Sequence, residues 1–128
     1  MRFLVVATLF FAGPTYAEVT VDYGEVKRII SDLEILHDAG AKIGTKYQLS
    51  KLSELRRCVG DNKANRNKAK SLREEVMKLG GLSYRSTLYR AADASFSCVY
   101  CGGDRAECAE IPKALGEARK LLKANGAN

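Results

Sequence analysis

Apolar side chains recur at every third or fourth position along most of the chain, which is the spacing that gives a helix one buried face. The alternation of apolar and polar residues that is typical of a strand is nearly absent. The pattern therefore predicts an all-α fold. Short links marked by glycine separate the segments, so we expect a small up-and-down bundle of about five helices.

Three helices are predicted in the first half of the chain. Asp22 and Glu25 have the spacing of a capping box, so the first helix begins there and ends at Gly40. A second helix is expected over 41–59, and a third from about 61 to 79. The inward positions expected in the first two helices are Val26, Ile29, Ile30, Leu33, Leu36, Ile43, Tyr47, Leu52, Leu55 and Val59.

Two further helices are predicted in the second half. The fourth covers about 82–99, and the fifth begins after Asp104, with residues 124–128 frayed. Pro112 lies inside the fifth helix and has no backbone N–H, so we expect a kink there. The inward positions expected in these helices are Leu88, Ala91, Ala92, Ser95, Val99, Cys108, Ile111, Leu115, Ala118 and Leu122.

The first residues, MRFLVVATLFFAGPTYA, have the pattern of an export signal. Arg2 precedes an apolar run that is broken at Pro14, and Ala17 is a small residue just before the expected cleavage point. The run is shorter than the roughly 20 residues that span a bilayer. We therefore expect a signal peptide over 1–17 and a single exported domain over 18–128, periplasmic or secreted, with no membrane span after the signal is removed.

The chain has four cysteines, Cys58, Cys98, Cys101 and Cys108. In an oxidising compartment they predict two disulfides. If the five helices alternate in direction, all four cysteines meet at one end of the bundle. The favoured pairing is Cys98–Cys108 with Cys58–Cys101, and the pairing Cys58–Cys98 with Cys101–Cys108 stays open.

The Cys98-Val-Tyr-Cys101 spacing also allows a thiol–disulfide redox pair, which is kept as an alternative. A redox nucleophile is favoured at a helix N-terminus, where the dipole stabilises thiolate, whereas Cys98 is predicted at a C-terminus. Four cysteines could also bind zinc, but disulfide formation competes with it. Gly102 stands where covalent haem attachment needs a histidine. We therefore expect neither a metal nor a cofactor.

No set of catalytic residues is recognisable. The chain has one histidine, His37, which lies near the end of the first predicted helix, where a positive charge suits the helix dipole. There is no Gly-X-Ser-X-Gly motif, no distinct carboxylate pair and no phosphate-binding glycine loop. We therefore expect a protein that is not an enzyme.

Positive charge is concentrated in one segment. Residues 56–73 contain seven basic residues and one acidic residue, and the net charge of +6 falls to +5 when Arg2 leaves with the signal. At helical spacing, four of the basic residues share one face of the third helix, which is either a solvated face or a docking surface for an acidic partner. These residues are Lys63, Arg66, Lys70 and Arg73.

A second candidate surface combines arginine and tyrosine, which are enriched at binding hot spots. Its residues are Tyr84, Arg85, Tyr89 and Arg90, for which partial burial is the alternative explanation. Small size, export, crosslinking and the lack of a catalytic set favour an exported binding protein, most concretely an inhibitor or immunity protein for a toxic enzyme acting in the envelope. Its expected partner is an acidic protein. An anionic envelope polymer or lipid is the alternative partner, and nucleic acid is disfavoured because no aromatic residues interleave the basic stripe.

Overall fold

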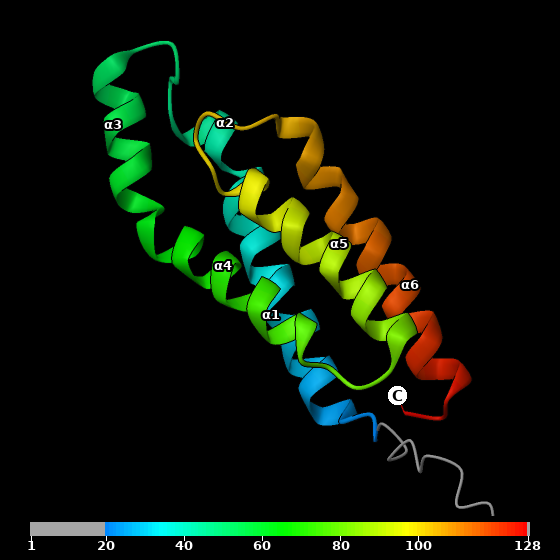
Figure 1. Cartoon of the computed structure of the whole chain (residues 1–128). Coiled ribbons are helices and arrows are strands. Elements are labelled where there is room, and N and C mark those ends of the chain that lie inside the picture. Colours follow the sequence, from blue (N-terminus) through cyan, green and yellow to red (C-terminus); the bar gives the residue numbers. More distant parts are fainter. Residues whose placement is uncertain (1–19, 128) are drawn as a thin grey trace, which may run out of the picture.

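The computed structural model describes residues 20–127, so the predicted signal peptide lies outside the described residues. Within this range the chain is helical and has no strand, which confirms the all-α prediction. Figure 1 shows the long helices alternating in direction along the molecule. The elements are α1 (Tyr23–Ala41), α2 (Ile43–Lys46), α3 (Leu52–Asp61), α4 (Lys63–Met77), α5 (Leu82–Cys98), the 3₁₀ helix η1 (Arg105–Ala109) and α6 (Glu110–Ala124).

Helices α1, α4, α5 and α6 share one hydrophobic core, and α5 packs against the other three. The face of α5 is built from small residues, because Ala91, Ala92 and Ser95 are buried there and let the neighbouring helices approach closely. Large aliphatic residues from the other helices fill the space around it, and each contributes about 1.5–3 kcal/mol through its burial. They include Ile29, Leu33, Leu36, Leu72, Ile111 and Leu115.

The start and end of α1 have different causes. The side-chain Oδ1 of Asp22 accepts the backbone N–H of Glu25 at 3.0 Å, which confirms the predicted cap. Gly40 was predicted as a helix stop, but the helix continues to Ala41. A Cβ at Gly40 would lie 2.2 Å from the Sγ of Cys98 and 2.7 Å from its carbonyl oxygen. Glycine is therefore required at this position by the close approach of α1 to α5.

The prediction of one helix over 41–59 was wrong. After the single turn of α2, Tyr47 adopts an extended backbone, with φ −125° and ψ 140°, and α3 starts only at Leu52. The extended conformation directs the Tyr47 ring into a small apolar cluster, where the side chain is buried. Burial of this aromatic side chain outweighs continuation of the helix.

The helix end predicted at Gly60 lies one residue before the observed end of α3 at Asp61, but the chain does not turn there. The backbone N–H of Asn62 donates to the carbonyl of Cys58 at 3.0 Å, and that of Arg66 donates to Asn62 at 2.9 Å. The helical hydrogen bonds thus continue from α3 into α4, and Figure 1 shows the two helices as one bent rod. A Cβ at Gly60 would meet no atom within 4 Å, so no packing requirement places glycine there.

The kink predicted at Pro112 within one long helix was also wrong. The segment is divided into η1 and α6, and Pro112 is the third residue of α6. In the first turn of a helix the backbone N–H groups have no partner inside that helix, so proline is tolerated. The buried seam from Cys108 through Leu122 is continuous, as the sequence pattern predicted.

The end of the described chain is held against the bundle. The backbone N–H of Ala127 donates to Leu122 at 2.8 Å, and the side-chain amide of Asn125 donates to the Tyr84 hydroxyl at 2.8 Å. Ala127 also packs against the main core. Residues 125–127, which were expected to fray, are thus tied to α5 and α6. Residue 128 lies outside the described residues.

A candidate binding site at the disulfide pole

All four cysteines lie at one end of the molecule, which we call the disulfide pole. The disulfides are Cys58–Cys101 and Cys98–Cys108, and no free cysteine is present in 20–127. This confirms the favoured pairing, and the alternative with Cys58–Cys98 was wrong. The Cys58–Cys101 disulfide joins the rod of α3 and α4 to the loop after α5, and the Cys98–Cys108 disulfide joins α5 to η1.

The Cys-X-X-Cys spacing does not correspond to a disulfide, because Cys98 and Cys101 bond to different cysteines. Both residues are buried, which shields their sulfur atoms from solvent thiols. Since every cysteine sulfur is used in a disulfide, none is available as a metal ligand in this structure. The Cys98–Cys101 disulfide that the redox alternative requires is therefore absent from residues 20–127.

Arg105, a half-buried residue of η1, connects three backbone segments of the pole by hydrogen bonds. Its guanidinium donates to the carbonyl oxygens of Gly40 at 3.0 Å, Ser97 at 3.4 Å and Tyr100 at 2.6 Å. The first two carbonyls belong to the last turns of α1 and α5, where helices leave carbonyl groups unpaired. Burial lowers the pKa of Arg105 from its ordinary value. No signal in the sequence distinguished this arginine from the exposed ones.

A second, smaller core lies at the pole. It consists of Ile43, Tyr47, Cys58 and Cys101, with three partly buried aliphatic residues packed against it. Cys58 is the one buried residue of α3, so α3 is attached mainly through its disulfide and this cluster. Figure 1 shows α3 standing apart from the helices of the main bundle.

A cavity of about 150 Å³ opens beside this cluster, between α2 and the junction of α3 with α4. Its lining combines apolar surface with two cationic groups and one anionic group. The lining residues are Ala39, Lys42, Ile43, Lys46, Tyr47, Asp61, Asn62 and Asn65. We call this cavity the pole pocket.

Tyr47 forms the aromatic wall of the pole pocket, and three charged side chains lie close to it. The hydroxyl of Tyr47 donates to Oδ2 of Asp61 at 2.6 Å, and this hydrogen bond raises the pKa of Tyr47 above its ordinary value. The guanidinium of Arg57 lies 4.8 Å from the centre of the Tyr47 ring, and Nζ of Lys46 lies 5.4 Å from it. Cation–π contacts thus hold positive charge at this corner.

Asn62 and Asn65 form a second wall of the pole pocket, and hydrogen bonds fix their side-chain amides. Asn62, only 5% exposed, donates from Nδ2 to the carbonyl oxygen of Cys58 at 3.0 Å. Its Oδ1 accepts from Nδ2 of Asn65 at 3.1 Å. Asn62 therefore links the disulfide-bonded turn of α3 to the first turn of α4.

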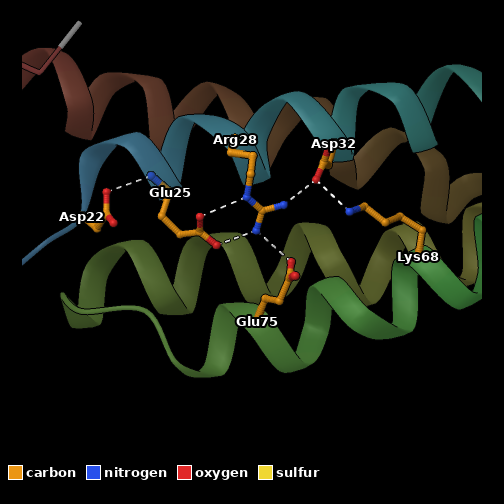
Figure 2. A network of polar contacts seen from close by, with 6 residues as sticks. All are labelled: Asp22, Glu25, Arg28, Asp32, Lys68 and Glu75. Atoms are coloured by element: carbon orange, nitrogen blue, oxygen red, sulfur yellow. Dashed lines mark hydrogen bonds and ion pairs between the residues drawn. The ribbon is translucent and has the colours of Figure 1, made fainter.

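The charged residues of α4, which include the predicted basic face, fall into two groups, those paired with residues of neighbouring helices and those without an ion pair in 20–127. Figure 2 shows Arg28 of α1 contacting Glu75 of α4 at 3.0 Å, while Lys68 of α4 contacts Asp32 at 3.1 Å. Further along α4, Arg73 pairs with Asp93 at 3.2 Å. The charges in the middle of the bundle are thus largely neutralised by neighbouring helices.

The other predicted cations of this face differ from Arg73. Lys63 and Lys70 are exposed and make no ion pair with any acidic residue of 20–127. Arg66 is half-buried, and its Nε has no hydrogen-bond partner in this part of the chain. Lys63 directly follows Asn62, a lining residue of the pole pocket, but is not itself part of the lining.

The second predicted surface is not assembled as one patch. Tyr84 is 3% exposed, so it belongs to the core and is left out of any partner surface. Arg85 donates to a backbone carbonyl, and Arg90 pairs with Glu117 of α6. Tyr89 and Arg90 are both exposed, and within residues 20–127 Tyr89 forms no hydrogen bond or ring contact with the other three that would join them into one surface.

Sequence reasoning missed Lys42 and Lys46. Their spacing of four residues places them on one face of a short helix, but both were assigned to a continuous helix over 41–59. Recognition of the extended backbone at Tyr47 is needed to see that these lysines turn toward α4. His37, the one histidine, is half-buried in α1, with Nδ1 3.7 Å from Oδ1 of Asp38, and does not line the pocket.

Comparison with known proteins assigns no relative to this chain. No protein family, curated protein or solved structure matches it. Among residues 20–127, none of the helices is both long enough and apolar enough to cross a bilayer. The chemistry of the disulfide pole is therefore the basis for a functional assignment.

Proposed function

We propose that this protein is an exported, non-catalytic binding protein whose disulfide pole docks against an acidic protein. The most concrete form is an inhibitor or immunity protein that neutralises a toxic enzyme acting in the cell envelope. Export rests on the signal-peptide pattern of residues 1–17, and the two disulfides are compatible with an oxidising compartment.

The main support is the set of unpaired lysines at the pole. Lys42 and Lys46 line the pole pocket, and Lys63 follows the lining residue Asn62 in sequence; all three are exposed and form no ion pair within residues 20–127. Carboxylates on a partner would meet these ammonium groups and would also accelerate association through long-range attraction.

The rigidity of the pole supports binding rather than catalysis. Two disulfides and the Arg105 contacts fix the loops around the pocket before a partner arrives. A surface that is already ordered loses less conformational entropy on association. Strong binding by a small interface is favoured by this preorganisation.

An anionic polymer or lipid surface is less favoured by the arrangement of charge. Such a partner is best matched by a continuous row of exposed cations. Along α4 that row is shortened, because Arg73 at its end is paired with Asp93 and Arg66 is half-buried. A compact acidic protein needs only the cluster at the pole.

The proposal is tested by co-purification from the native envelope fraction, with the disulfide-bonded mature chain as bait. We expect one stoichiometric protein with an acidic surface, released as salt is raised because screening weakens the attraction. Recovery of polysaccharide or lipid without a protein would support the polymer alternative instead. Absence of any stoichiometric partner would contradict the proposal.

A further inference from the structure

We infer that the pole pocket receives a single carboxylate, the side chain of one acidic residue on the partner protein, between Lys42 and Lys46. This inference rests on the proposed function and names the place where the partner is recognised. It concerns a different surface from the α4 face that the sequence pattern indicated.

The size of the pocket limits its occupant. Its volume is about 150 Å³. Sites for small molecules usually have volumes of roughly 300–1,000 Å³. The pole pocket is therefore suited to one side chain presented by a larger partner rather than to a cofactor or a free metabolite of ordinary size.

The charge of the pocket selects an anion. Lys42 and Lys46 belong to its lining, and the Arg57 guanidinium stacks on the Tyr47 ring at its edge. The opposing charges are Asp61, whose Oδ2 already accepts the Tyr47 hydroxyl, and Glu54, which is paired with Arg57. A cationic ligand would be repelled by the two lysines that line the pocket, whereas a carboxylate would be attracted by both.

Neutral donors in the pocket also suit a carboxylate. An amide nitrogen has two N–H groups, and one from Asn65 is used by Asn62. The second N–H of Asn65 is available at the pocket wall. A carboxylate offers about four lone-pair positions, enough to accept from this amide and from both lysines.

The disulfide makes this wall rigid. Nδ2 of Asn62 lies 3.7 Å from Sγ of Cys58, and it donates to the carbonyl of the same residue. Cys58 is in turn bonded to Cys101 in the loop after α5. The donor at Asn65 is thus positioned through Asn62 by a crosslink, so ligand binding does not have to order it.

The test uses N-acetylglutamate amide as probe and N-acetylglutamine amide as its neutral isostere. In the ¹⁵N-labelled, disulfide-bonded protein, we expect saturable shifts of the side-chain amide signals of Asn62 and Asn65 with the glutamate probe only. The affinity should fall as salt is raised from low to high ionic strength.

Two variants of equal net charge make the test specific. Lys42→Gln with Lys46→Gln should weaken glutamate binding about tenfold or more, because the two ammonium groups supply the charge-assisted hydrogen bonds. Lys27→Gln with Lys123→Gln removes two exposed lysines from the opposite end of the bundle and should leave the affinity unchanged. Unchanged backbone signals verify that both variants are folded.

Equal shifts with both probes would overturn the inference, and so would undiminished glutamate binding in the Lys42 and Lys46 variant. A partner complex that tolerates this double substitution without loss of affinity would also overturn it while leaving the proposed function intact. Failure of the co-purification would instead count against the proposed function itself.

Discussion

The helical bundle and the disulfide pole are stabilised by different interactions. In the bundle, four helices share one core, and ion pairs such as Arg28–Glu75 and Arg73–Asp93 join neighbouring helices. At the pole, a separate small core consists of Ile43, Tyr47, Cys58 and Cys101, and two disulfides supply further constraint. Arg57 at the pole is paired with Glu54, but Lys42, Lys46 and Lys63 form no ion pair within residues 20–127. Crosslinks thus keep a positively charged region rigid where there is too little apolar surface to do so.

The largest contrast between the two regions is expected from leucine truncation. Leu88 is fully buried in the main core, whereas Leu55 is only partly buried at the pole. Leu88→Ala should lower the free energy of unfolding by about 2–5 kcal/mol, and Leu55→Ala by only about 1 kcal/mol. Chemical denaturation measures both. Equal losses would show that the pole and the bundle are not separate cores.

Removal of the Cys58–Cys101 disulfide is expected to affect the pole selectively. Cys58→Ala with Cys101→Ala should lower stability by about 2–4 kcal/mol, because the crosslink constrains the unfolded chain. Amide exchange should become faster in α2 and α3, while α5 and α6 stay protected. Uniformly faster exchange throughout the chain would contradict this local role.

The matched control removes Cys98 and Cys108 in the same way. The two crosslinks join residues separated by 43 and by 10 positions. In the chain-entropy view the longer loop gives the larger stabilisation, by about 1 kcal/mol. A larger loss from the shorter crosslink would mean that packing around Cys98, rather than loop closure, dominates.

Gly40 lies where α1 of the bundle contacts Cys98 at the pole, and its substitution should have the next largest effect on stability. A methyl group at this position would collide with Cys98, so Gly40→Ala should destabilise by about 1–3 kcal/mol. Gly116 lies in α6 with nothing within 4 Å of its Cβ position, so Gly116→Ala should stabilise by about 0.5–1 kcal/mol. Thermal unfolding distinguishes these opposite signs, and destabilisation by both would contradict the packing explanation.

The smallest expected effect is a pH dependence at the pole. The hydrogen bond to Asp61 raises the folded-state pKa of Tyr47 above its ordinary 10.0. Its contribution is fully present below pH 10.0 and is lost as the pH rises through the folded-state pKa. Tyr47→Phe should cost about 0.5–1.5 kcal/mol at neutral pH and remove this alkaline decline.

Absorbance titration follows the ionisation of tyrosine directly. Subtraction of the Tyr47→Phe curve from that of the parent protein should give one group titrating above pH 10.0. A difference curve centred at or below the ordinary value would contradict the Tyr47–Asp61 hydrogen bond.

The bundle was predictable because its helices obey local periodicity. Long stripes such as Val26 to Leu36 and Ile111 to Leu122 are visible in the sequence and are buried as expected. The disulfide pairing was predicted correctly although three helix directions were wrong: relative to α1, helices α4, α5 and α6 run opposite to the directions expected from five alternating helices. Cys58 reaches the pole because the rod of α3 and α4 begins there, not because a helix ends there.

The site was less predictable because it depends on contacts between distant residues. The backbone at Tyr47 leaves the helix to bury a ring against Cys58 and Cys101, which no local pattern encodes. Likewise, helical spacing placed Lys63 and Arg73 on one face but could not show that Asp93 neutralises only the latter. Long-range acidic partners therefore decided which cations remain available.

The central claim is that the cations of the pole, rather than the net charge of the protein, bind the partner. Its most direct test is the dissociation constant of the purified complex for three baits, the parent chain and two variants with equal net charge. Lys42→Glu with Lys63→Glu changes the pole, and Lys27→Glu with Lys123→Glu changes the opposite end. We expect the pole variant to lose about tenfold or more in affinity, while the control changes by less than about threefold. Equal losses, or no loss in the pole variant, would contradict the account.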